Sequence, residues 1–275
     1  MDNILQGDVL SHLQDVELMI LKDFVKICEE NNIEYYLIFG TQIGAIRHQG
    51  FIPWDDDIDI MIFREDYERF LKVMEEHPND KYTIFDPRYD QEYCFEFGRM
   101  SLNGTYWAEY WDNQVSFKLG IHIDLFILDV LPDNKIKRWL FIQYCFIVTR
   151  LHAISLLRFD NYPKIINLIL NFIHALLNFI KLNPTYFQKR IPKLFRKYEK
   201  SDSGQFVTDL TLHERVVFKR NDYKPPKRAK FEDSFFYIPN DDDNTLIPIY
   251  GDYMKLPPEE EQFCHILNEI DFVKY

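Results

Sequence analysis

The sequence predicts an α/β fold of the α+β kind, in which a mixed β-sheet core carries an added apolar helical subdomain. Over residues 9–127, short apolar segments typical of buried strands are interspersed with longer segments whose apolar residues recur at helical spacing. From residue 135 to about residue 200, the pattern is helical and strongly apolar. A chain of 275 residues is long enough to bury such a core.

Three regions follow from this pattern. We predict a core over residues 1–134, a helical insertion over residues 135–205 and a C-terminal segment over residues 206–275 that packs back on the core. No disordered or low-complexity tract interrupts them.

The charge of the chain excludes one class of partner. A net charge of −12 argues against general nucleic-acid binding, which needs cations spread over a face. Residues 181–230 nevertheless hold 14 Lys and Arg against 5 Asp and Glu, a surplus of 9, so the rest of the chain carries −21. This basic sector suits an anionic partner or membrane surface. The alternative is that its lysines only solvate helices and loops.

The cysteines and the first residues indicate a cytoplasmic location. Cys28, Cys94, Cys145 and Cys264 are far apart and form no CxxC pair, so neither a zinc knuckle nor a disulfide framework is expected. Residues 1–8 are acidic and polar, where a signal peptide has a basic stretch followed by an apolar one.

The N-terminal elements are predicted in the order helix, strand, turn, helix. Residues 9–31 have apolar side chains at steps of three and four, and residues 35–39 are typical of a buried strand. Gly40 and Thr41 are expected to form a turn, with a short helix over residues 42–48. A strand, a Gly-polar turn and a helix together form a phosphate-holding geometry.

The loop of residues 49–54 leads to a cluster of aspartates. A strand is expected over residues 58–63, followed by an amphipathic helix that ends near residues 77–80. Side chains alternate along a strand, so Asp57 and Asp59 are predicted on one face and the intervening isoleucine on the other.

Two further strands are predicted over residues 93–102 and 121–127, joined through an aromatic, hairpin-like stretch around Tyr106 and Trp107. In the second of these, Asp124 shares a face with His122. Asp124 is therefore a candidate third carboxylate on a strand of the same sheet.

The apolar region contains an unusual helix and no uninterrupted apolar run of the roughly 18 to 20 residues that a spanning helix needs. We expect this helix to be buried against its neighbours, the alternative being a helix in a bilayer interface. The segments at 237–243 and 249–257 are predicted to be polar and turn-like. The helix has a narrow polar stripe made of Asn167, Asn171, His174, Asn178 and Lys181.

Clustered carboxylates on adjacent strands suit metal-dependent transfer of a phosphoryl or nucleotidyl group. Carboxylate oxygens favour Mg²⁺, with Mn²⁺ as an alternative, and two such ions can activate a hydroxyl and neutralise a leaving phosphate. The bland alternative is an acidic surface loop or a weak Ca²⁺ site, although the EF-hand spacing is not met. Arg47 and Arg99 could grip a phosphate or pair with an acid, and His48 and His122 could move protons or simply pack.

Three motifs resemble one family. Residues 39–60 read FGTQIGAIRHQGFIPWDDDIDI, residues 120–129 read GIHIDLFILD and residues 250–257 read YGDYMKLP. These closely resemble, in the same order, the LicD family of bacterial phosphocholine transferases, to which the fukutin-related proteins are distantly similar. The resemblance spans nearly the whole chain and is weakest over residues 135–200.

The resemblance implies a nucleotidyltransferase-like catalytic core, a Mg²⁺-dependent site and a CDP-linked donor whose headgroup phosphate passes to a glycan hydroxyl. Gly40 and Thr41 match the motif that holds the donor phosphates. Asp57 and Asp59 match metal ligands, and Asp124 matches a third carboxylate that is either ligand or general base. Arg99 lies where a basic residue meets the donor.

The headgroup and acceptor stay open. Phosphocholine from CDP-choline is expected, with phosphoethanolamine, glycerol phosphate, ribitol phosphate or nucleotidyl transfer as rivals and a non-catalytic adaptor as another class. The acceptor is expected to be a glycan or lipid-linked glycan for teichoic acid, capsule or lipopolysaccharide, which would bring the enzyme to the inner membrane face. A quaternary ammonium is bound by aromatic faces, and the candidates are Trp54, Tyr106, Trp107, Tyr110 and Trp111.

Overall fold

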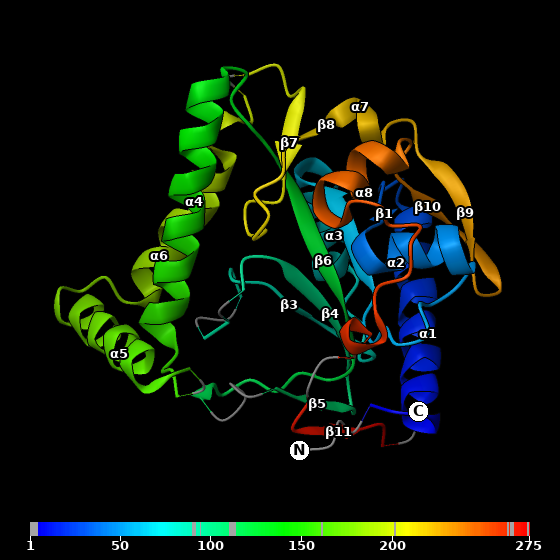
Figure 1. Ribbon diagram of the computed structural model, residues 1–275, viewed down its shortest axis with the longest axis horizontal. Helices are drawn as coiled ribbons and strands as arrows, with labels where there is room; N and C mark the ends of the chain where they lie inside the picture. The colour runs from blue at the N-terminus through cyan, green and yellow to red at the C-terminus, as the bar shows by residue number, and fades with distance from the viewer. Residues whose placement is uncertain are drawn as a thin grey trace.

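A mixed β-sheet lies at the centre of the protein (Figure 1), which confirms the predicted fold class. Its strands run in the order β1-β2-β6-β4-β3, with β7 added beside β6 and β8 beside β7. The pair β2 and β6 is parallel and the other pairs are antiparallel. The strands are β1 (Tyr36–Leu37), β2 (Asp59–Phe63), β3 (Tyr82–Phe85), β4 (Gly98–Leu102), β6 (His122–Val130), β7 (Phe206–Thr208) and β8 (Phe218–Lys219).

The structure is a computed structural model of the chain. The residues that it describes are 5–89, 92–93, 95–109, 114–160, 162–200, 202–262, 264, 267–273 and 275. Cys94, Tyr110 and Trp111 lie outside the described residues. The thiols of Cys28, Cys145 and Cys264 are buried.

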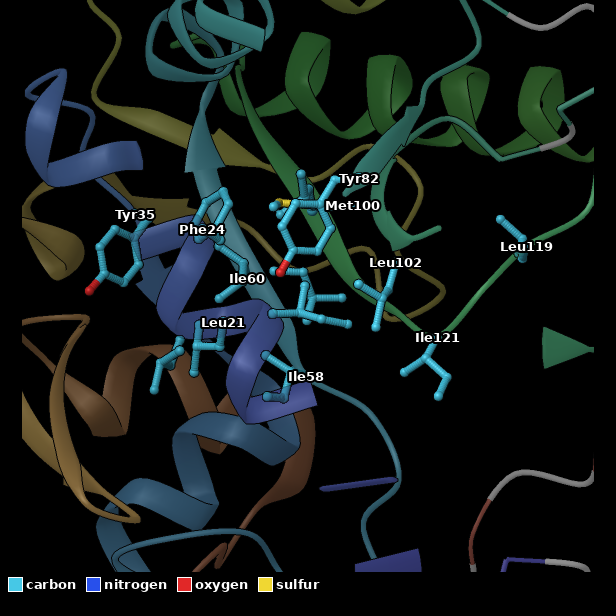
Figure 2. Packing of buried hydrophobic residues seen from close by; sticks show 14 of the residues in the cluster. Leu21, Phe24, Tyr35, Ile58, Ile60, Tyr82, Met100, Leu102, Leu119 and Ile121 are labelled. Carbon is cyan, nitrogen blue, oxygen red and sulfur yellow. The ribbon is translucent and has the colours of Figure 1, made fainter. Parts of the chain in front are cut away.

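Helices α1 (Asp8–Glu30) and α3 (Arg64–Glu76) cover one face of the sheet. Their apolar stripes meet alternate strand residues such as Ile60, and Figure 2 shows Phe24 of α1 over this part of the sheet. Both helices match the predicted segments, because each has a clear stripe at helical spacing that a sheet face can bury. The other face carries a smaller cluster in which Met61 and Phe63 pack against Tyr223 of α7 (Arg220–Tyr223).

The passage from β1 into the next helix differs from the predicted turn. Helix α2 (Phe39–Ile43) starts directly after Ile38, and the π-helix η1 (Gly44–His48) continues it. Phe39, the first residue of α2, adopts a left-handed φ of 50°. Gly40 and Thr41 therefore lie in the first turn of a helix and not in a separate turn.

Two strand predictions need correction. The segment predicted over residues 93–102 is a strand only from Gly98, and β3 was not predicted. The aromatic stretch forms β5 (Tyr106–Ala108), and Trp107 also bridges Leu119, but the main partner of β5 is β11 (Glu269–Asp271) near the C-terminus. Such a pairing between segments 160 residues apart carries no local sequence signal.

Residues 135–198 form helices beside the sheet (Figure 1). These are α4 (Lys135–Leu156), α5 (Lys164–Phe179), α6 (Pro184–Phe195) and the short 3₁₀ helix η3 (Arg196–Tyr198). Helices α4 and α6 pack through one cluster that includes Cys145 and Phe187. The predicted region boundaries at 134 and 205 stay a prediction.

By length and composition, α4 could cross a membrane, and α5 and α6 would qualify only as a pair bent by 88°. One side of α4 is nevertheless part of the protein interior. Its His152 is fully buried, and Nδ1 lies 2.5 Å from Oε1 of Glu96. This side of α4 therefore packs inside the protein.

The prediction that the helix with the polar stripe is buried is wrong. This helix is α5, and among its described side chains only Leu177 is buried. Its apolar side chains face outward, as described below.

The C-terminal segment returns to the core. Strands β9 (Lys227–Phe231) and β10 (Ser234–Ile238) form a hairpin, followed by α8 (Asp242–Tyr250) and the 3₁₀ helix η4 (Glu259–Glu261). The predicted turn at 241–243 is the start of α8, where the Asp241 side chain accepts a hydrogen bond from the Asn244 N–H at 3.0 Å.

Candidate active site

Two aspartates on neighbouring strands form the centre of the site. Asp59 begins β2, and its register partner on the parallel strand β6 is Asp124. Register partners in a sheet point to the same face. The predicted convergence of these two carboxylates therefore follows directly from the strand pairing, whereas Asp57 lies just before β2.

Burial and the acidic cluster raise the pKa of Asp59. Burial raises the pKa of this carboxyl well above its usual range, and the charges of Asp57, Asp124 and Asp55 raise it further, while Arg99 lowers it. The residue is only 8% exposed. A site that gathers buried acids in this way favours a bound cation.

Thr41 holds the backbone of Asp59 in position. Its Oγ1 accepts a hydrogen bond from the Asp59 N–H at 2.9 Å, and the threonine is 2% exposed. Gly40 has a different role in the same turn of α2. A Cβ at Gly40 would lie 2.7 Å from Oδ2 of Asp55, so a larger residue would displace that carboxylate. The predicted contact of both residues with donor phosphates stays a prediction.

Arg99 on β4 is held against Asp124. The two are register partners, and Nε of Arg99 donates to Oδ1 of Asp124 at 2.8 Å. The guanidinium also lies 3.6 Å from a carboxylate oxygen of Glu109 and 4.3 Å from the ring centroid of Phe95. Burial disfavours its charge, but Asp124, Tyr93 and Glu109 together outweigh this effect and raise the pKa of Arg99. Arg99 thus positions Asp124, and its contact with a donor stays a prediction.

His122 stands two residues before Asp124 on the same face. Its Nε2 lies 3.6 Å from Oδ1 of Asp124, and its Nδ1 lies 2.9 Å from the Gly120 carbonyl oxygen. The ring also meets Trp107 edge to face, with centroids 5.3 Å apart. His122 therefore packs beside the site.

A cavity of about 620 Å³ opens beside the acidic cluster. It brings together Gly40, Arg47, Trp54, Asp57 and Asp59, which are five of the eight predicted site residues. Thr41, Arg99 and Asp124 do not line this cavity. Each contacts a residue of the aspartate pair or belongs to it. Residues that the sequence interpretation had not assigned to the site also line the cavity: Tyr250, Tyr253, Lys255 and Glu261.

Arg47 fastens the C-terminal segment over this cavity. Its Nη1 donates to the carbonyl oxygens of Tyr253 at 2.6 Å and of Lys255 at 3.3 Å. Helix α8 is attached in a similar way, because Nε2 of Gln42 donates to Asp242 and to Thr245, each at 3.1 Å. The segment 250–257 is therefore a wall of the site, and Asp252, predicted to be a turn former, lines the cavity.

Glu17 is the main charged residue that sequence reasoning missed. It lies on α1 and is 1% exposed, and its Oε2 has no hydrogen-bond partner among the described residues. Burial raises its pKa, and the charges of Asp57, Asp56, Asp55 and Asp124 raise it further. The signal was available, because Glu17 interrupts the apolar stripe of α1.

The aromatic candidates separate into two groups. Trp54 lines the cavity, where Tyr250 and Tyr253 join it. Burial and the charges of Asp59, Asp55 and Asp57 raise the pKa of Tyr250. Trp107 is buried at 5% exposure and does not line the cavity, and neither does Tyr106, which lies near Lys118.

The residues present fit a hard divalent cation by their chemistry. Asp57, Asp59 and Asp124 supply only oxygen donors, which Mg²⁺ and Mn²⁺ prefer. In the part of the chain that the structure describes, no three His, Cys, Asp or Glu side chains stand as a ready-made metal site. In this structure Oδ1 of Asp124 accepts a hydrogen bond from Nε of Arg99.

Comparison with known proteins agrees with this geometry. Residues 32–144 match the family described as LicD/FKTN/FKRP, nucleotidyltransferase domain. The chain is 30% identical over 272 residues to the lipopolysaccharide cholinephosphotransferase LicD of Haemophilus influenzae, which covers 94% of this chain and 97% of that protein. A 65-residue segment, 24% of this chain, is 42% identical to an uncharacterized protein of Rickettsia typhi and 40% identical to one of Rickettsia prowazekii, covering 21% and 24% of those proteins. The chain therefore belongs to the LicD family and is a LicD-type phosphotransferase.

Proposed function

We propose that the protein transfers phosphocholine from CDP-choline to a sugar hydroxyl of a cell-surface glycan precursor and releases CMP. The observation that carries this proposal is the register pairing of Asp124 with Asp59, which lines a cavity large enough for a nucleotide-linked donor. The full-length similarity to a lipopolysaccharide cholinephosphotransferase favours lipopolysaccharide over teichoic acid or capsule as the acceptor.

The lining of the cavity supports a cationic headgroup. Trp54, Tyr250 and Tyr253 provide aromatic faces, and Asp252 and Glu261 provide negative charge. Aromatic faces attract quaternary ammonium groups through the ring quadrupole. A choline headgroup matches this combination better than the neutral hydroxyls of glycerol or ribitol phosphate.

In the proposed reaction, the acceptor oxygen forms a new bond to the headgroup-bearing phosphorus while the bond from that phosphorus to the CMP oxygen breaks. The acceptor hydroxyl loses its proton, and CMP leaves with the bonding electron pair. Asp57, Asp59 and Asp124 would hold Mg²⁺ or Mn²⁺, which supplies neutralisation of the diphosphate charge. Asp124 either shares in this binding or accepts the proton, and Arg99 keeps it oriented for both roles.

The direct test offers the purified protein a panel of CDP-linked donors with Mg²⁺ and a glycan acceptor and measures CMP release. CDP-choline should be consumed fastest, ahead of CDP-ethanolamine, CDP-glycerol and CDP-ribitol. Asp59→Asn should abolish release, and Asp252→Asn, in the same cavity, should alter donor preference without abolishing it. Fastest release from CDP-glycerol or CDP-ribitol would overturn the choline assignment.

Two further rivals are separated by the same assay. With a donor labelled in the headgroup, phosphocholine transfer places the label on the acceptor, whereas nucleotidyl transfer would leave the label in released phosphocholine. A non-catalytic adaptor would bind a donor and release no CMP. The presence of all three expected carboxylates favours catalysis over an adaptor.

A further inference from the structure

Helix α5 has its polarity reversed relative to an ordinary surface helix. A helix on a globular protein turns its apolar stripe inward and its polar face to water. In α5 the polar stripe faces the protein, because its side chains bond backbone groups of residues 154–162 at the end of α4 and in the following connection. Figure 1 shows α5 at the outer side of the helical region, away from the sheet.

Four hydrogen-bonded side chains fix this orientation. Asn167 bonds both the N–H and the carbonyl of Tyr162, at 3.1 and 2.8 Å. Asn171 does the same to Phe159, again at 3.1 and 2.8 Å.

Two further side chains of the polar stripe form hydrogen bonds with backbone carbonyls of α4. Nδ1 of His174 lies 2.8 Å from the Ile154 carbonyl oxygen, and Asn178 donates to the Ser155 carbonyl at 3.2 Å. Rotating α5 to bury its apolar face would break these bonds, so the exposed face belongs to the folded state.

The outward face of α5 is a continuous apolar stripe. Phe179 is 86% exposed and Phe172 is 67% exposed. A smaller exposed stripe on α4 adds Trp139, at 61%. We call the α5 stripe the apolar face; its members are Ile165, Leu168, Ile169, Phe172, Leu176, Phe179 and Ile180.

The charged residues around the apolar face are predominantly basic. Residues 135–200 hold 13 Lys and Arg against 2 Asp and Glu, a surplus of 11, so the rest of the chain carries −23. Between Asp160 and Glu199 there is no acidic residue at all. Exposed cations flank α5 or follow it on α6, and they include Lys164, Lys181, Lys189, Arg190 and Lys193.

We propose that the apolar face of α5 binds the surface of an anionic lipid bilayer. A helix of 16 residues is about 24 Å long, shorter than the roughly 30 Å hydrocarbon core, so α5 lies in the interface and does not span it. Apolar side chains enter the acyl boundary while neighbouring lysines and arginines meet anionic headgroups.

The charge distribution selects lipid over a second copy of the chain. Two copies joined through α5 would bring together two regions that each carry a surplus of 11 positive charges, with only Asp160 and Glu199 in each region to offset them. An anionic membrane offers the complementary charge and an apolar layer in one surface. Binding needs neither donor nor acceptor, so its test is independent of the proposed function.

The experiment is sedimentation of the full chain with vesicles of phosphatidylglycerol and phosphatidylcholine, beside vesicles of phosphatidylcholine alone. Wild type should bind the anionic vesicles and bind the neutral ones much more weakly. The double variant Phe172→Ser/Phe179→Ser should bind anionic vesicles about tenfold or more weakly, because two membrane-inserted rings are lost. Phe235→Ser is the matched control, since Phe235 is 61% exposed on β10, and it should bind like wild type.

A second readout locates the contact. Tryptophan fluorescence of Phe172→Trp should be quenched by brominated lipid more than that of Phe235→Trp. Equal quenching, or equal binding of wild type and the double variant, would overturn the proposal. So would a wild-type dimer that the double variant loses, without vesicle binding, because that outcome assigns the apolar face to a second copy. Circular dichroism verifies that each variant is folded.

Discussion

Asp59 and Asp124 are register partners on the parallel strands β2 and β6, so their side chains point to the same face of the sheet. The pairing places two carboxylates side by side at the point where β2 begins, and other residues of the site hold them in position. Thr41 holds the backbone of the first and Arg99 holds the side chain of the second.

Replacing Arg99 with alanine should strongly destabilise the protein. The change leaves Asp124 without its buried cation, and breaking a buried ion pair costs about 3–5 kcal/mol. The measurement is denaturant unfolding of wild type and Arg99→Ala. Arg99→Lys, which keeps the charge but not the Nε contact, should recover part of the free energy of unfolding. Equal unfolding midpoints for wild type and Arg99→Ala would show that Arg99 does not support the site.

Thr41→Val should lower both stability and turnover. The valine has a similar shape but cannot accept the hydrogen bond from the Asp59 N–H, and an unsatisfied buried N–H costs about 1–3 kcal/mol. We expect kcat to fall about tenfold, because Asp59 loses its fixed position. Thr41→Ser keeps the hydroxyl and should remain close to wild type. A valine variant with normal kcat would mean that the hydroxyl does not position Asp59.

Arg47→Ala should act on substrate binding more than on turnover. The change frees the carbonyls of Tyr253 and Lys255 and loosens the wall that residues 250–257 form over the cavity. We expect the donor KM to rise about tenfold with a smaller change in kcat. Amide hydrogen exchange in residues 250–257 should speed up in the variant. A drop in kcat with unchanged exchange would instead favour direct phosphate contact by Arg47.

Asp209 should make stability depend on pH. Burial raises the pKa of this carboxyl to about 6, against the hydrogen bonds from Ile127 and Thr211, which lower it. A folded pKa above the unfolded value of 3.8 stabilises the protein fully below pH 3.8. That contribution is lost as the pH rises through about 6. The size of the loss is about 3 kcal/mol, at roughly 1.4 kcal/mol for each pKa unit.

The comparison is between wild type and Asp209→Asn, whose side chain does not titrate. The free energy of unfolding of wild type minus that of the variant should decrease between pH 4 and pH 6. A constant difference over this range would contradict the raised pKa. The comparison cancels the titration of all other carboxylates.

The sequence predicts the parts of this protein that depend on local pattern. Helices α1 and α3 follow from their apolar spacing, and the alternation along β6 correctly places Asp124 on the face opposite Ile123 and Leu125. The motif around Asp57 and Asp59 was sufficient to find one wall of the cavity.

The remaining features depend on contacts that no local pattern encodes. The bonds from Arg47 to the carbonyls of Tyr253 and Lys255 join segments about 200 residues apart, and the pairing of β5 with β11 joins segments about 160 residues apart. The orientation of α5 was predicted incorrectly for a physical reason. Its asparagines bond the backbone of the preceding connection, so the usual rule for an amphipathic helix is inverted.

The central claim is that Asp57, Asp59 and Asp124 together bind a divalent cation. The most direct measurement is calorimetric titration of Mg²⁺ into wild type, Asp59→Asn and Asp252→Asn, the last being an acid of the same cavity outside the cluster. We predict saturable binding in wild type and Asp252→Asn, and affinity reduced at least about tenfold in Asp59→Asn. Equal heats for wild type and Asp59→Asn would show that these carboxylates do not hold the ion.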